Sequence, residues 1–117
     1  MNGPDLATPD PDACIHRCVA LDRPRLLAGG IAVVACDGAV QPLVSVAKAL
    51  AFPAFYGGNW DAMDECLRGL DAWWPAAGWV LEVGGARGTA WRALDDCWRD
   101  AAQIHAAAGR PFHLVYA

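Results

Sequence analysis

Residues 55–69 read Phe55-Tyr56-Gly57-Gly58-Asn59-Trp60-Asp61-Ala62-Met63-Asp64-Glu65-Cys66-Leu67-Arg68-Gly69. The two glycines can adopt positive φ in a loop, and Asn59 is a good N-cap for a helix that begins after it. Beyond the cap, apolar side chains recur at steps of three and four residues. They are Trp60, Met63, Leu67 and Leu70. The stretch therefore predicts an aromatic loop that leads into an amphipathic helix, whose apolar side must pack on another layer.

Apolar runs on both sides of this helix predict strands. The run at 31–36 is continuous, which is typical of a buried parallel strand. In the run at 78–83, Trp79, Leu81 and Val83 are expected on one face of the sheet. Val80 and Glu82 are then expected on the opposite face. Residues 112–116 form a third apolar run, which predicts the last strand.

Two further segments have the periodicity of helices. Residues 42–51 begin at Pro42, which suits a first helical position, and Pro53 follows their end. Residues 89–108 repeat apolar side chains at steps of three and four, and Gly109 comes directly after them. The order of strand, helices, strand, helix and strand argues for a small parallel α/β sheet with right-handed crossovers.

Length and composition indicate one globular domain, because the chain has 117 residues, of which 56% are apolar. The formal charge of -4 works against binding nucleic-acid phosphates or an anionic membrane and favours a basic partner. We find neither a secretory signal pattern nor an apolar run long enough to span a membrane. The five cysteines are odd in number, so they are interpreted as reduced thiols of a cytoplasmic protein.

The first 29 residues differ from the rest of the chain. Residues 1 to 12 carry three prolines and three aspartates with little that is apolar, which predicts a flexible tail. Residues 13–28 have apolar side chains to bury, while Pro24 prevents one long helix over the segment. Because this segment leads directly into the first predicted strand, we expect it to cover the free face or edge of the sheet, away from the acidic helix.

The second helix carries its charges on one side. Asp61, Asp64, Glu65 and Arg68 fall within one arc, opposite the apolar stripe. Alone, this pattern is typical of an ordinary solvated helix face, with Arg68 pairing with Asp64 or Glu65. The exposed aromatic loop directly before it favours a protein-binding patch instead. Aromatic rings supply contact area, and carboxylates attract a basic partner and orient its approach.

The same stretch resembles the signature of the barstar family. That signature is an aromatic pair, Gly, any residue, Asn, a large apolar residue, Asp-Ala-Leu, and an acidic residue before Cys-Leu. The resemblance extends over about residues 30–117 and leaves residues 1–29 as an N-terminal extension. It implies a small two-layer domain with a three-stranded parallel sheet, in order 1-2-3, and helices packed mainly on one face.

The resemblance also implies a function, which is to bind a basic ribonuclease and occlude its active site without chemistry. It implies a protein partner, no cofactor, no metal, no small-molecule substrate and no enzymatic activity. Glu65 matches the central acidic residue, Asp61 lies beside it, and Asp100 on the long helix makes an outlying contact. The aromatic loop and the start of the helix would pack on the enzyme through Phe55, Tyr56, Gly57, Asn59 and Trp60.

Three departures from the family pattern bear on the partner. Glu65 replaces the usual aspartate, Asp64 stands where the family has tryptophan, and Arg68 adds a positive charge to the acidic face. They favour a target related to barnase over barnase itself. A second interpretation is a barstar-like module for a different toxin or partner protein.

A third interpretation is a small thiol or metal enzyme that uses Cys14, His16 and Cys18. The sequence offers it no second Cys/His pair, no glycine-rich phosphate loop and no paired acid and base. The other two histidines, His105 and His113, are expected to be packed and hydrogen-bonded residues rather than catalysts.

Overall fold

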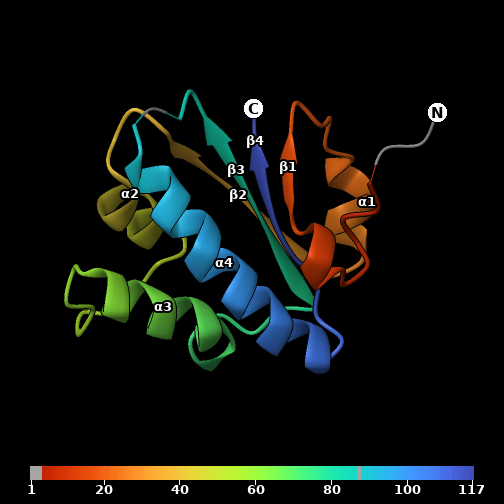
Figure 1. Cartoon of the computed structure of the whole chain (residues 1–117). Coiled ribbons are helices and arrows are strands. Elements are labelled where there is room, and N and C mark those ends of the chain that lie inside the picture. The colour runs from red at the N-terminus through yellow and green to blue at the C-terminus, as the bar shows by residue number, and fades with distance from the viewer. Residues whose placement is uncertain (1–3, 87) are drawn as a thin grey trace.

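The computed structural model describes residues 4–86 and 88–117. Its centre is a parallel sheet of four strands, shown in Figure 1. They are β1 (Ile15–Arg17), β2 (Ile31–Asp37), β3 (Gly78–Gly84) and β4 (Phe112–Tyr116), in the order β1-β4-β3-β2. The three expected strands are present and adjacent in the expected order, but the expectation of only three strands is wrong.

The additional strand, β1, comes from the N-terminal extension and pairs with β4. Ile15 lies opposite Leu114, and His16 lies opposite Val115. Three residues are too few to show a period of two in the sequence, so the pairing with β4 creates this strand rather than any local pattern.

Three helices cover one face of the sheet: α2 (Pro42–Ala49), α3 (Trp60–Arg68) and α4 (Ala90–Ala107). Their bounds agree with the expected helices to within two residues. A one-turn 3₁₀ helix, Leu70–Ala72, follows α3, so Leu70 lies beyond the helix whose stripe it was expected to extend. No helix in the described ranges is both long and apolar enough to cross a bilayer.

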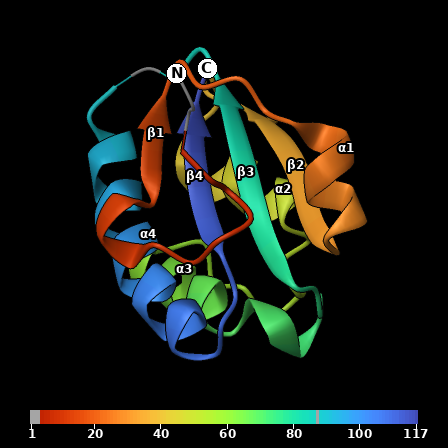
Figure 2. The same cartoon turned by 90° about the vertical axis from the view of Figure 1, so that its right-hand side faces the viewer.

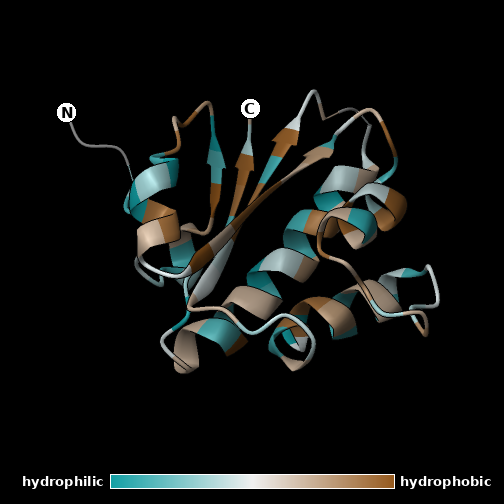
Figure 3. Cartoon of the chain, turned by 180° about the vertical axis from the view of Figure 1, so that it is seen from behind, coloured by the Kyte–Doolittle hydropathy of each residue, from teal (hydrophilic) through white to brown (hydrophobic). Residues whose placement is uncertain are grey.

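The main core lies between these helices and the sheet. Trp79, Leu81 and Val83 are fully buried in it, whereas Val80 belongs to a second cluster on the other face, which confirms the expected alternation along β3. Trp98 of α4 stacks on Phe112 with ring centroids 4.0 Å apart. The sheet is accordingly apolar along its centre in Figure 3. This packing fixes α4, and through it α3, relative to the sheet.

The N-terminal residues cover the opposite face, as Figure 2 shows. Leu6 of the N-terminal segment is 5% exposed there, and Leu26 of α1 (Arg23–Ala28) is 3% exposed. Both pack with Val80 and Val115. Arg23 adds an ion pair to Glu82 of β3 at 2.6 Å. Residues 4–12 therefore differ from the expected flexible tail, because one buried leucine attaches them to the sheet. Residues 1–3 of that tail lie outside the described residues.

This face also changes the expected layering. Helices lie mainly on one face, as expected, but α1 and the N-terminal segment add a thin third layer on the other. The division of the chain into an extension, 1–29, and a domain, 30–117, stays a prediction.

Candidate functional site

The loop before α3 presents one aromatic ring and anchors the other. Phe55 is 79% exposed. The hydroxyl of Tyr56 donates to the carbonyl oxygen of Leu43 at 2.7 Å, and its ring meets Phe52 edge-on at 5.0 Å. Burial raises the pKa of this hydroxyl. Tyr56 thus holds the loop on α2, and the ring of Phe55 lies exposed on its surface.

The junction from loop to helix has the geometry expected from its residue types. Gly58 has φ +73°, a conformation that other residues rarely adopt. Asn59 then caps α3, with its side-chain oxygen accepting from the amide of Ala62 at 2.8 Å. Trp60 is half-buried and packs against the main core. Asn59 and Trp60 therefore position the start of the acidic helix.

We expect Asn59→Ala to lower the free energy of unfolding by about 1 kcal/mol, because the amide of Ala62 loses its acceptor. Denaturant unfolding measures the change. Asn59→Asp keeps an acceptor at the same place and serves as the matched control. Equal losses in both variants would contradict a capping role.

The charges of α3 divide into paired and unpaired groups. Asp64 forms an ion pair with Arg68 at 3.0 Å, one helical turn away. Asp61 and Glu65 are exposed, and within the described ranges neither makes an ion pair. The face thus presents two free carboxylates and one that is neutralised by its neighbour.

Helix α4 extends this acidic surface. Asp100 is exposed and, among residues with described positions, has no ion-pair partner, while Asp96 pairs with Arg99 at 3.4 Å. Burial raises the pKa of the half-buried Cys97 thiol, and the carboxylates around it raise it further. These carboxylates are Asp64 and Asp61 of α3 and Asp100 and Asp96 of α4. Both helices therefore direct acidic side chains toward one stretch of surface.

Sequence reasoning named Asp100 but missed Asp96 and Ile104. Each lies one helical turn from Asp100, and Ile104 is 50% exposed. The spacing of four residues around Asp100 was the available signal. This spacing alone could not indicate a shared surface, because the sequence does not show that α4 lies beside α3.

The ends of α3 and α4 are joined through His105. Its Nε2 donates to the carbonyl oxygen of Leu67 at 2.8 Å, and Arg110 Nε approaches its Nδ1 at 3.4 Å. Arg110 also pairs with Asp71 at 3.7 Å. Burial lowers the pKa of His105. The expectation of a packed, hydrogen-bonded histidine is confirmed, and its role is to hold the two acidic helices together.

The segment with Cys14, His16 and Cys18 places one thiol in the core and the other on the surface. Cys14 is 2% exposed, and burial raises the pKa of its thiol to about 11, so it is protonated at neutral pH. Cys18 is exposed at the end of β1. In the part of the chain that the structure describes, no group of three or more His, Cys, Asp or Glu side chains is arranged to hold a metal ion.

A parallel α/β domain that exposes an aromatic ring beside unpaired carboxylates has the make-up of a protein-binding domain. Residues 33–117 match the family model described as Barstar (barnase inhibitor). The match covers more than half of the chain, and the chain belongs to the barstar family. This is a family of inhibitors rather than enzymes. Neither the curated proteins nor the solved structures compared with the chain gave a match.

Proposed function

We propose that the chain binds a basic ribonuclease of the barnase kind and occludes its active site. One observation carries the proposal. Of the five acidic side chains on the outer sides of α3 and α4, Asp64, which stands where the family has tryptophan, and Asp96 are each paired with an arginine. The three that match family contacts, Asp61, Glu65 and Asp100, have no ion pair within the described ranges.

Unpaired carboxylates are the groups that an active site built for phosphates would bind. A ribonuclease must hold the anionic backbone of RNA with cationic side chains, and carboxylates from a partner compete for the same groups. Glu65 would occupy the centre of that site and Asp61 a position beside it. Phe55, Tyr56, Gly57, Asn59 and Trp60 would form the adjoining contact, and Asp100 an outlying one. No bond is made or broken, and no cofactor is involved.

The charge pattern also bears on which ribonuclease is bound. The side chain of Glu65 is one methylene longer than that of aspartate, which alters its reach. Arg68 and Asp64 together present a neutral pair in the middle of the acidic surface. A target that carries matching polar groups there would be preferred over barnase itself.

The same pair supports a second candidate function, which is a barstar-like module for another toxin. Arg68 brings a cation to a position where it would repel the cationic groups of a ribonuclease. Capture of the neighbouring gene product with retained RNA cleavage by barnase would favour this candidate. The proposal above keeps the stronger support, because the three matching carboxylates have no ion pair among the residues that the structure describes.

The direct test is inhibition of RNA cleavage. Barnase is the probe, and cleavage of a fluorogenic RNA substrate is followed while the purified chain is added. Because barnase is not the preferred target, we expect the loss of cleavage to need an excess of the chain over the enzyme. Full cleavage at a large excess of the chain, together with no binding in calorimetry, would contradict binding to barnase.

We expect the association rate with a basic ribonuclease to fall as salt is added. An acidic surface that meets a basic one is steered by long-range attraction, which is screened beyond about 10 Å at 0.1 M salt. Stopped-flow mixing over a range of salt concentrations measures the rate. The Arg68→Gln variant should associate faster at low salt than the natural chain, because it removes the one cation from the face. A rate that does not change with salt would contradict electrostatic steering.

A further inference from the structure

Two histidines connect the N-terminal segment to the sheet, on the face opposite the candidate site. Nε2 of His16 on β1 lies 2.9 Å from Nδ1 of His113 on β4. Nε2 of His113 lies 2.8 Å from the carbonyl oxygen of Thr8. This series of contacts joins residues that are 97 and 105 positions apart in the sequence. Neither histidine has a part in the acidic surface or in its support by His105.

The contacts determine where the protons lie. A carbonyl oxygen only accepts, so Nε2 of His113 carries a proton and donates it to Thr8. In neutral His113 the other nitrogen, Nδ1, is then unprotonated and accepts from Nε2–H of His16. Both hydrogen bonds are also kept when one proton is added at Nδ1 of His16, because its Nε2–H still donates to His113. Two added protons would place two N–H donors face to face at 2.9 Å.

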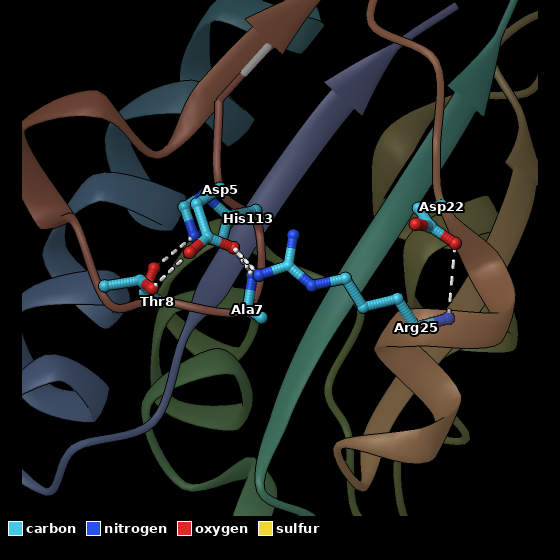
Figure 4. Close-up of polar contacts among 6 residues, drawn as sticks. All are labelled: Asp5, Ala7, Thr8, Asp22, Arg25 and His113. Atoms are coloured by element: carbon cyan, nitrogen blue, oxygen red, sulfur yellow. Dashed lines mark hydrogen bonds and ion pairs between the residues drawn. The ribbon is translucent and has the colours of Figure 1, made fainter. Parts of the chain in front are cut away.

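The charged groups around the pair come from the N-terminal segment and α1. Asp5 and Asp10 of the segment favour protonation of His113, and Asp10 also favours that of His16. Asp5 is already engaged, because it accepts from Thr8 Oγ1 at 2.8 Å and pairs with Arg25 at 3.5 Å, as Figure 4 shows.

Burial outweighs these carboxylates at both histidines. It is the largest effect on each and lowers both pKa values, and the charge of His113 lowers that of His16 further. Below the ordinary pKa of histidine, the two histidines thus bind more protons when the segment is detached or unfolded than when it is attached. The attachment therefore loses stability as the pH falls and regains it as the pH rises.

We propose that His16 and His113 form a pH-sensitive latch, which holds residues 4–17 on β4 until both rings are protonated and releases them in mildly acidic solution. Release removes β1 from the edge of the sheet and lifts Leu6 from the cluster that covers Val80 and Val115. Release also takes Cys14 and Ile15 out of the main core beside α4, whereas α3 packs on α4 and α2 and should stay in place. The proposal does not depend on the function proposed above.

Hydrogen exchange of the full chain tests the latch locally. The amide of Cys18 donates to the carbonyl oxygen of Tyr116 at 2.8 Å and reports whether β1 is attached. An opening that takes up one proton becomes about tenfold more favourable for each pH unit below the ordinary histidine pKa. Between neutral pH and about pH 5.5 we expect the exchange of this amide to accelerate several-fold after correction for the intrinsic rate. The amides of α3, which packs on α4 and α2, should show no such change.

Two variants distinguish the effect of His16 and His113 from that of the third histidine, His105. In the double variant His16→Gln/His113→Gln the side chains no longer titrate, and we expect the acid acceleration at Cys18 to disappear. In His105→Gln, the matched control on the other layer, it should persist. Persistence in the double variant, or its absence in the natural chain, would overturn the proposal.

A second measurement on the natural chain needs no variant. Nuclear magnetic resonance of the histidine side chains reports both tautomer and titration. We expect protonated Nε2 in both rings at neutral pH, and both pKa values below that of a free histidine. An Nδ1–H tautomer in His113, or titration of either ring at or above the ordinary value, would overturn the proposal.

Discussion

Replacing Glu65 by alanine is expected to weaken binding to a basic ribonuclease by about 2–5 kcal/mol, mainly through faster dissociation. The reason is the position of this carboxylate. It is exposed on the helix that follows the aromatic loop and makes no ion pair within the described ranges. Its removal would leave cationic groups of the enzyme buried against an interface without a partner.

Surface plasmon resonance or stopped-flow dissociation measures the effect, and two further variants sharpen it. Glu65→Gln keeps the size and removes the charge, so a loss close to that of Glu65→Ala assigns the effect to charge. Asp12→Ala removes an exposed acid from the N-terminal segment and should change nothing measurable. Equal losses for Glu65 and Asp12 would place the interface elsewhere.

Deleting residues 1–28 is expected to remove most of the stability of the domain or to cause self-association. The deletion removes Leu6 and Leu26 and bares Val80 and Val115 on the sheet. Loss of one buried leucine side chain costs about 2–5 kcal/mol. Two such losses are comparable with the total stability of a small domain, which is about 5–15 kcal/mol. A bared apolar face also promotes association between copies.

Thermal unfolding and light scattering measure both consequences. A matched pair of point variants tests the same face without truncation, because Leu26 is 3% exposed and its neighbour Leu27 is 59% exposed. Leu26→Ala should lower the free energy of unfolding by about 2–5 kcal/mol, and Leu27→Ala should have little effect. A deletion that keeps full stability but abolishes ribonuclease binding would instead make the extension part of the binding site.

The sequence by itself determined the elements whose pattern is local. The alternation at 78–83 placed Trp79 and Val80 on opposite faces, and Asn59 after Gly58 marked the start of α3. These predictions hold because side-chain direction in a strand or helix repeats over two to four residues. The pattern of residues 55–69 also pointed to the barstar family, whose model matches residues 33–117.

The tertiary structure alone decided which distant residues meet. Strand β1 exists because β4 lies beside it, and the flexible tail expected from composition is attached at Leu6. The acids of α3 and α4 are brought around Cys97 by helix packing, and arginines one turn away decide which of them stay unpaired. The contact between His16 and His113 spans 97 positions. Such contacts depend on how layers pack, and no periodicity of the chain encodes them.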